Sequence, residues 1–356
     1  MSIWRYEKLL DSPAHRVTLG EGQTPVVPSQ RLGPALGLPQ LSLKLETSNP
    51  TGSYKDRFAA AAISHMRSRG QTKCLATSSG NTGSALAAYC AGANLPCTIA
   101  IVEPAPLGKL TQMLAYGATL LRVRGFGIDP AITAQVLDRL TAAAQRPDIA
   151  LQISAYCYSP LGMAGVQTIA YELAEQLESI DHVFVSAGGG GLTLAIARGF
   201  YDLVRTGHLR RSPKIHCVQP EGNATIARAL RTGRERAERV DCTTTISGLQ
   251  VPIVLDGDDV IAACRASGGT GYLVSDAAVF ALQKRLAREE GIFTEPAGAV
   301  ALAGAAQAIA SGEIGSGERV VCIVTGSGFK DSAAAEAMIA DTSCPLVSAD
   351  ELFERV

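Results

Sequence analysis

The sequence predicts an α/β fold in which helices cover both faces of largely parallel sheets. Short, continuously apolar segments alternate along the chain with longer stretches of helical periodicity. Continuous apolar strands are typical of parallel sheets, because helices bury both faces of such a sheet. The chain has 356 residues, which is enough for about two domains of roughly 150 residues each. We therefore expect two three-layer α/β domains.

The alternation gives specific expectations for the elements. Seven apolar segments are expected as strands, at 73–79, 97–102, 119–124, 150–156, 182–187, 214–220 and 319–326. Six amphipathic segments are expected as helices, at 81–93, 108–118, 129–145, 163–177, 192–204 and 275–291. We expect a smaller domain at 65–152, inserted into a larger domain made of 1–64 and 153–356.

Composition and charge exclude several classes of protein. Hydrophobic residues make up 47% and charged residues 18% of the chain, which favours a large buried core over disorder. The net charge is −1 and no basic stripe is present, so nucleic acid is not expected as a partner. No apolar run approaches the ~20 residues of a membrane span. The first residues, MSIWRYEKLLDSPAHR, lack the apolar segment of a signal peptide.

The cysteines and histidines do not predict a metal site. Nine cysteines are scattered along the chain without a C-x-x-C pair, which argues against a disulfide framework or a zinc site. The five histidines have no ligand spacing. This cysteine usage is typical of a reducing compartment, so we expect a cytoplasmic protein with no bound metal.

Polar or glycine-rich turns follow three of the expected strands. They are SSGNTG at 78–83, GGGG at 188–191 and GSGFKD at 326–331. The first two open expected helices, where backbone N–H groups can bind an anion. Each turn alone has an ordinary alternative, because glycine runs form tight turns and Asn81 could cap a helix. Since strand carboxyl ends carry the ligands in such folds, we expect the three turns to form one site.

A lysine in an unusual setting completes the pattern. Lys55 lies in NPTGSYKDR (49–57), directly before an alanine-rich run. Taken alone, Lys55 could be a surface residue and Thr325 an ordinary strand-end residue. Two nucleotide motifs are excluded, because no segment matches G-x-x-x-x-G-K-[ST] and GGGGLT breaks G-x-G-x-x-G at its sixth position.

Together these motifs resemble those of the fold-type II pyridoxal-phosphate enzymes, which share a tryptophan synthase β-like fold. Within that group the chain is most similar to threonine synthase and its close relatives. The resemblance begins at GEGQTPVV (20–27), takes in the lysine and asparagine motifs, LGKLTQ, SAGGGGL and FTEPAGA, and ends at VTGSGFKD. It therefore covers most of the chain. It implies a lyase that acts on an amino acid, uses pyridoxal 5'-phosphate and forms a homodimer.

The resemblance also implies a role for each site residue. Lys55 corresponds to the lysine that binds the cofactor as a Schiff base, and Asn81 to the asparagine that contacts the ring hydroxyl. Gly188, Gly189, Gly190 and Gly191 correspond to the loop that holds the cofactor phosphate, and Thr325 corresponds to the hydroxyl residue that faces the ring nitrogen. Ser78, Ser79 and Thr82 correspond to the turn that receives the substrate carboxylate. Lys109 matches a threonine synthase lysine that could face a substrate anion; taken alone, it could be a surface lysine at the start of a helix.

The sequence departs from threonine synthases at three places, which bear on the substrate. Segment 154–168 lacks their phosphate-binding arginine, the phosphate loop is pure glycine, and Ser327 stands where a histidine is common. The first expectation is elimination of phosphate from O-phosphohomoserine, followed by addition of water at the β carbon to give threonine. The alternatives are a serine/threonine ammonia-lyase and a β-replacement enzyme resembling cysteate synthase. A catalytically silent relative is disfavoured by the presence of Lys55, Asn81 and Thr325.

Overall fold

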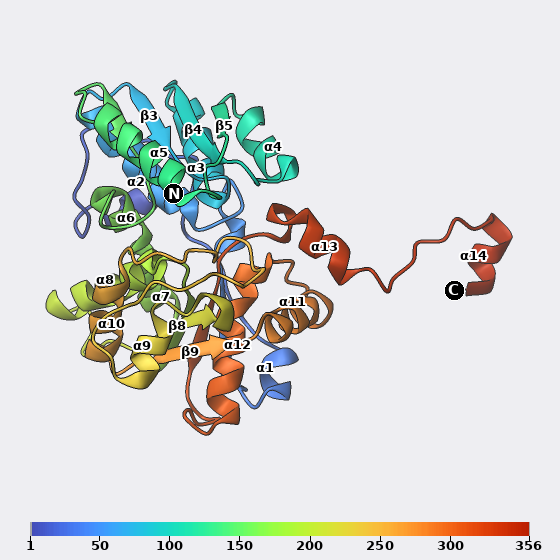
Figure 1. Cartoon of the computed structure of the whole chain (residues 1–356). Helices are drawn as coiled ribbons and strands as arrows, with labels where there is room; N and C mark the ends of the chain where they lie inside the picture. The colour runs from blue at the N-terminus through green and yellow to red at the C-terminus, as the bar shows by residue number, and fades with distance from the viewer. Residues whose placement is uncertain (1, 356) are drawn as a thin grey trace.

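The computed structural model describes residues 2–355, whose strands form two sheets in two bodies, one above the other in Figure 1. The upper body contains a four-stranded parallel sheet in the order β5-β4-β3-β6. The lower body contains a six-stranded sheet in the order β1-β2-β10-β7-β8-β9, in which only β1 and β2 pair antiparallel. The strands are β1 (Val26–Pro28), β2 (Leu41–Leu45), β3 (Lys73–Ala76), β4 (Cys97–Val102), β5 (Thr119–Val123), β6 (Ile149–Leu151), β7 (His182–Ser186), β8 (Lys214–Pro220), β9 (Gly271–Val274) and β10 (Val320–Val324).

Helices surround both sheets, and the last one lies apart from them. The α-helices are α1 (Leu32–Ala35), α2 (Lys55–Ser68), α3 (Asn81–Gly92), α4 (Leu107–Ala115), α5 (Pro130–Ala143), α6 (Pro160–Val166), α7 (Thr168–Gln176), α8 (Gly191–Arg205), α9 (Ala227–Thr232), α10 (Gly257–Ala266), α11 (Asp276–Glu290), α12 (Pro296–Ala310), α13 (Ser332–Met338) and α14 (Ala349–Arg355). Short 3₁₀ turns lie at Ile3–Tyr6, Glu46–Ser48, Glu221–Asn223 and Gly328–Lys330. Figure 1 shows α14 at the end of an extended segment that leaves the lower body. In the part of the chain described, no helix combines the length and apolar character needed to span a membrane.

The larger sheet is buried on both faces, as its apolar strands predict. Neighbouring residues of β7 point to opposite sides, so Val183 packs in one core and Phe184 in another. The first core continues upward through Phe58 of α2 and Ile99 of β4, so it joins the two bodies. The second core includes α12, a helix of mostly small apolar residues that packs closely against the sheet. The α/β fold with parallel sheets is therefore confirmed.

The structure differs from the predicted elements at several turns, and it contains strands and helices that were not predicted. The expected strand 150–156 ends at Leu151, because residues 152–156 bend away and Ile153 donates its N–H to Ser159 Oγ. The expected helix 163–177 begins earlier, at Pro160, and is divided into α6 and α7 at Gln167. Strands β1, β2 and β9 were not predicted. The proposed domain boundary after residue 64 falls within α2, so the division into domains stays a prediction.

Candidate active site

The predicted site residues lie together around one cavity of about 490 Å³. It is lined by the segments that follow β3, β6, β7 and β10, together with the start of α2 and part of α4. All predicted site residues line it, namely Lys55, Ser78, Ser79, Asn81, Thr82, Lys109, Gly188, Gly189, Gly190, Gly191 and Thr325. The parallel topology explains this, because it brings the carboxyl ends of neighbouring strands to one edge.

The turn before Lys55 is stabilised by contacts among its own residues and by one bridge to Gly326. Gly52 has a φ of +86°, a conformation that favours glycine, and it lets the chain reverse before α2. The Thr51 hydroxyl donates to Asp56 Oδ2 at 2.8 Å, and Ser53 forms an isolated antiparallel bridge with Gly326. Lys55 is the first residue of α2. The turn therefore fixes the point from which the lysine enters the cavity.

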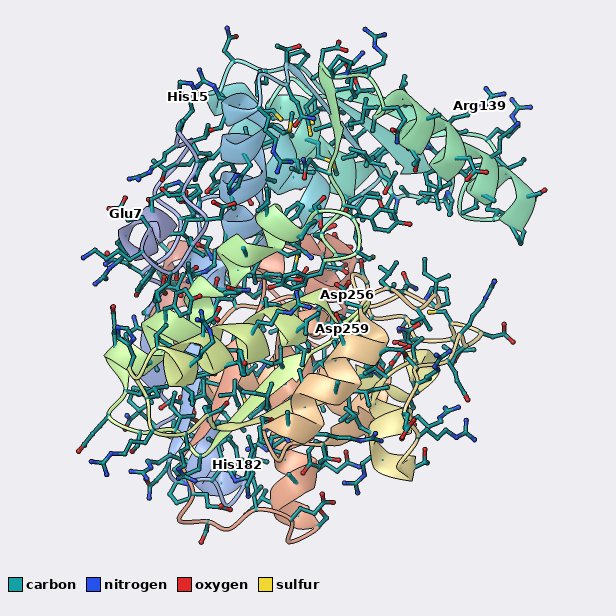
Figure 2. The ribbon with its side chains drawn as sticks, turned by 90° about the vertical axis from the view of Figure 1, so that its left-hand side faces the viewer. Glu7, His15, Arg139, His182, Asp256 and Asp259 are labelled. Atoms are coloured by element: carbon teal, nitrogen blue, oxygen red, sulfur yellow. The ribbon has the colours of Figure 1, made fainter. Side chains whose placement is uncertain are left out.

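The Lys55 amine meets a pair of hydroxyl groups in the cavity. Its Nζ donates to Ser154 Oγ at 2.8 Å, and Ser154 Oγ lies 2.9 Å from Thr82 Oγ1. The same Nζ lies 4.5 Å from the centre of the Tyr54 ring. The Ser154 segment is itself anchored by Asp256, whose carboxylate accepts the N–H groups of Tyr156 and Cys157 at 2.8 and 3.1 Å. Figure 2 shows Asp256 near the level where the two bodies meet.

A charged network lies buried behind the lysine turn. Arg57 is fully buried. It donates hydrogen bonds to Glu46, which directly follows β2, and to Glu172 of α7, at 2.7 and 2.6 Å. Lys44 of β2 donates to Glu172 at 2.7 Å and to the backbone oxygen of Thr24. Such a group of charges is stable only while all partners are present. The network therefore ties α2 to the larger sheet immediately beside Lys55.

The asparagine turn contacts a carboxylate that the sequence analysis did not assign. Asn81 begins α3, and its Nδ2 donates to Glu295 Oε1 at 2.8 Å. Burial raises the pKa of the Glu295 carboxyl to about 7, although the hydrogen bond from Asn81 opposes the rise. Glu295 belongs to the FTEPAGA motif, but sequence spacing alone does not reveal that it faces Asn81. Ser78 Oγ accepts the N–H of Gly80 at 3.2 Å and thereby shapes the same turn.

The glycine loop presents unpaired backbone donors. Among the described residues, none accepts a hydrogen bond from the N–H groups of residues 188–191. Gly190 has a φ of +95°, and a Cβ there would lie 2.7 Å from Val260 Cγ2. A side chain at this position is therefore excluded by both conformation and space. Free N–H groups at the start of α8 suit a phosphate.

A buried hydroxyl group without a hydrogen-bond partner lines the cavity. Thr325 follows β10 and is 3% exposed, and within residues 2–355 its Oγ1 has no hydrogen-bond partner. A buried hydroxyl without a partner is costly, by roughly 1–3 kcal/mol. Such a group is accounted for when a ligand supplies the missing partner.

Two further lysines line the cavity. Lys109 of α4 donates to Ser247 Oγ and to Asp331 Oδ2, the latter at 3.2 Å. Lys330, which the sequence analysis quoted within GSGFKD but did not assign, donates to Gln112 Oε1 at 2.6 Å. Burial lowers the pKa of the Lys330 amine, while the carboxylates of Asp56 and Glu295 oppose this effect.

These observations together fit pyridoxal phosphate. The free N–H groups of residues 188–191 suit its phosphate, the unpartnered Thr325 hydroxyl suits its ring nitrogen, and Lys55 supplies an amine for its aldehyde carbon. Asn81 suits the ring hydroxyl, since its side chain already lies in the cavity. The donor set therefore accounts for every polar part of the cofactor.

Comparisons with known proteins agree with this cofactor. Residues 17–326 match the family model described as "Pyridoxal-phosphate dependent enzyme". The threonine synthase of Methanosarcina acetivorans is 34% identical over 336 residues, which cover 93% of this chain and 80% of that protein. The threonine synthase of Methanocaldococcus jannaschii is 34% identical over 344 residues, covering 94% and 82%.

Solved structures share the fold at lower identity. The processed form of threonine deaminase isoform 2 from Solanum lycopersicum has a TM-score of 0.75 and 23% identity, covering 96% of this chain and 94% of that one. Serine racemase from Dictyostelium discoideum has a TM-score of 0.72 and 23% identity, covering 92% and 97%. The family match and the threonine synthase relatives each cover most of the sequence. The chain therefore belongs to the fold-type II pyridoxal-phosphate dependent enzymes.

Proposed function

We propose that this enzyme is a threonine synthase, which converts O-phosphohomoserine and water into threonine and phosphate. The observation that carries the proposal is the position of Lys109 and Lys330 in the cavity that also contains Lys55. A substrate with an amino acid at one end and a phosphate at the other needs basic groups at both ends. The similarity to two curated threonine synthases supports the same conclusion.

At the amino-acid end, the Lys55 amine is the proposed proton carrier. When bound, pyridoxal phosphate withdraws electrons from the substrate and makes its carbon-bound protons removable. Lys55 Nζ can then accept a proton and return it at a neighbouring carbon. Ser154 Oγ, at 2.8 Å, orients this amine, and Thr82 Oγ1 in turn orients Ser154. The Ser78–Ser79 turn is proposed to bind the substrate carboxylate.

At the phosphate end, the two lysines have different partners. Lys109 is paired with Asp331 and Ser247, so an incoming phosphate must share Lys109 with a carboxylate. Among the described residues, the Lys330 side chain donates a hydrogen bond only to the neutral amide of Gln112, while the carboxylates of Asp56 and Glu295 lie close enough to act on its charge. We therefore assign the phosphate to a site between Lys109 and Lys330, with Ser247 as an additional donor.

A second candidate function is a serine/threonine ammonia-lyase, for which a phosphate site is unnecessary. Of the described residues that line the cavity, the only strongly basic ones are Lys55, Lys109 and Lys330, and none is arginine. Arginine forks are the usual ligands of a phosphate dianion, because they bind two oxygens at once. The lack of such a fork favours a substrate without phosphate, and it leaves a β-replacement enzyme open as well.

The experiment compares substrates in matched variants. kcat/KM is measured for O-phosphohomoserine, O-phosphoserine, serine and threonine, in the wild type, Lys109→Ala and Lys109→Arg. We expect O-phosphohomoserine to be preferred and Lys109→Ala to reduce its kcat/KM by roughly 10- to 150-fold, the effect of one lost charged hydrogen bond. Lys109→Arg keeps the charge and should retain more of the activity. The surface variant Lys284→Ala, in which only a pair with Asp341 is lost, serves as the control.

The opposite result is equally clear. If serine or threonine is turned over best and Lys109→Ala leaves the order of substrates unchanged, the threonine synthase proposal is wrong. The cofactor assignment survives that result, because it depends on other residues. We also propose, from the family resemblance, that the enzyme is cytoplasmic and forms a homodimer. Light scattering at several concentrations tests the dimer.

A further inference from the structure

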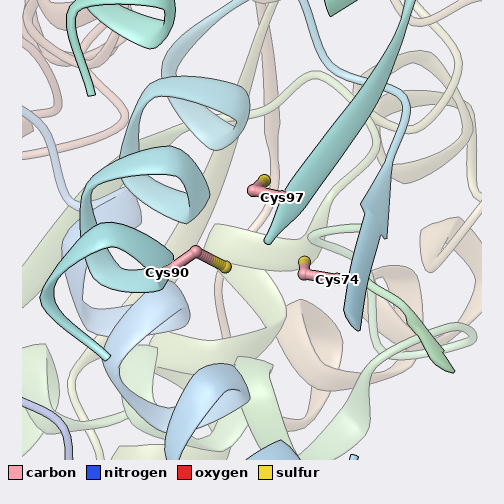
Figure 3. Close-up of side chains that lie close together, drawn as sticks. All are labelled: Cys74, Cys90 and Cys97. Atoms are coloured by element: carbon pink, nitrogen blue, oxygen red, sulfur yellow. The ribbon is translucent and has the colours of Figure 1, made fainter. Parts of the chain in front are cut away.

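Three of the nine cysteines come together inside the smaller sheet layer. Cys74 lies on β3, Cys90 on α3 and Cys97 at the start of β4, and all three are buried. Their Sγ atoms lie within 4.8 Å of one another. Figure 3 shows Cys90 directed from the helix toward the two strand cysteines. The scattered sequence positions gave no sign of this cluster, because the fold alone unites them.

The fold explains why the three thiols share one space. Cys74 and Cys97 are register partners in the parallel pair of β3 and β4, so their side chains point to the same face of the sheet. Helix α3 packs against both strands, and Cys90 lies in its last turns. The cluster is therefore held by three separate elements of regular structure. Its geometry does not depend on a loop.

We propose that Cys74, Cys90 and Cys97 bind one Cu⁺ ion through their three sulfur atoms. Cu⁺ is a d¹⁰ ion that prefers sulfur ligands. With metal–sulfur distances of about 2.3 Å, sulfur atoms at the corners of a trigonal site lie about 4.0 Å apart. The separations of up to 4.8 Å thus need to shorten by less than about 1 Å, which small rotations of the three side chains can supply. Sulfur ligands favour Cu⁺ over harder ions.

The number of ligands separates Cu⁺ from Zn²⁺. Among the described residues, no histidine, carboxylate or fourth cysteine belongs to the group. Structural zinc sites are almost always four-coordinate, so a buried site with three ligands does not meet that requirement. A Cu⁺ ion is satisfied by three sulfur ligands, so this cluster can complete its coordination without a water molecule.

Metal binding and loss of the thiol protons are coupled at this site. The thiolate is the form of cysteine that binds a metal, so each cysteine that becomes a ligand of Cu⁺ gives up its proton to solvent. The apolar surroundings penalise an isolated thiolate, so the ion and the thiolates are stable there only together.

The surface turn before β4 provides an entry route. Pro96 is exposed and directly precedes Cys97, and Asn94 in the same turn is exposed as well. An ion can therefore reach Cys97 from this turn before it is transferred to Cys74 and Cys90. The other end of α3 carries Asn81, so the cluster and the asparagine turn belong to the same helix.

The experiment measures Cu⁺ binding without relying on turnover. The host is the full chain carrying Cys157→Ser and Cys344→Ser, because those two thiols are exposed and could bind metal on their own. The host is titrated anaerobically with Cu⁺ against a coloured Cu⁺ chelator, and its melting temperature is recorded. We expect one ion per chain and a higher melting temperature with Cu⁺.

Variants and a second metal decide the outcome. Cys90→Ala and, separately, Cys97→Ala should lose the stoichiometric ion, whereas Cys264→Ala, which removes a buried thiol outside the cluster, should keep it. Circular dichroism of each variant shows whether it has folded, and a variant that fails to fold is replaced by the corresponding serine variant. The proposal is overturned if the host binds no Cu⁺, if Cys90→Ala and Cys97→Ala bind it as the host does, or if Zn²⁺ binds at one per chain and Cu⁺ does not.

Discussion

At the scale of single residues, the position of Lys55 depends on its sequence neighbours. Asp56 holds the turn through Thr51, Arg57 is anchored in the buried network, and Gly52 supplies the positive φ. This explains why the motif NPTGSYKDR could be recognised from the sequence, because several of its residues have a structural role in the turn. Glu295 could not be identified as a site residue in this way, because it contacts Asn81 only in the folded chain, where the start of α12 lies against the asparagine turn.

Replacing Lys55 with alanine should abolish turnover, because both the covalent hold on the cofactor and the proposed proton transfer use the same amine. The purified wild type is expected to be yellow, and borohydride reduction should attach the cofactor to one peptide that contains Lys55. Mass spectrometry after proteolysis makes the measurement, with Lys284→Ala as the control. A label on a different lysine contradicts the assignment.

Glu295→Gln should change how stability depends on pH. The pKa of Glu295 is about 7 in the folded protein and 4.5 ordinarily, so between these values the folded chain keeps a proton that the unfolded chain has lost. The free energy of unfolding of the wild type therefore falls as pH rises through this window, by about 3 kcal/mol in total. Glutamine does not ionise, so the variant should gain stability relative to wild type at pH 8 and less at pH 5.

Thermal melts of both proteins without cofactor, at pH 5 and pH 8, provide the measurement. Asp56, whose pKa burial also raises to about 7, is present in both chains and cancels in the comparison. An equal difference between wild type and variant at the two pH values would mean that Glu295 is ionised throughout.

At the scale of elements, the sequence predicted strands best where both faces are buried. Segments 182–187 and 214–220 are mostly apolar and correspond to β7 and β8. Strand β2, LSLKL, was missed because its charged Lys44 suggests an exposed residue, whereas the fold buries it against Glu172. Strand β9 is short and follows two glycines, so local pattern gives little sign of it. Its partner β8 determines its conformation.

The buried network that joins α2 to the larger sheet gives an element-scale prediction. Arg57→Met leaves the carboxylates of Glu46 and Glu172 without their main partner, so we expect a loss of about 3–5 kcal/mol in the free energy of unfolding. The matched control is Arg234→Met, which removes only an exposed pair with Glu238 and should cost less than about 1 kcal/mol.

Urea denaturation followed by circular dichroism measures both variants. The assignment of the network as a structural link between α2 and the sheet is wrong if the Arg57 and Arg234 variants lose similar amounts of stability.

At the scale of the whole molecule, the cavity is lined by segments from both sheet layers, so the cofactor should stabilise them together. A ligand present at 100 times its Kd adds about 2.7 kcal/mol to the stability of the form that binds it. Removing pyridoxal phosphate should therefore lower the melting temperature of the chain as one cooperative unit, and adding it back should restore that temperature. Differential scanning calorimetry tests this, and a separate transition that ignores the cofactor would contradict it.

The order of strands in the larger sheet has a consequence for biosynthesis. Strand β10 lies between β2 and β7 in the sheet. During translation, β2 and its partner β1 therefore cannot pair with β10 until almost the whole chain has been synthesised. Thr325 directly follows β10 and is among the last parts of the cavity to leave the ribosome. An open edge of β2 exposed for this long can pair with other nascent chains. The nascent protein is thus expected to depend on chaperones until β10 is inserted, and to acquire its cofactor only after translation of the cavity is complete.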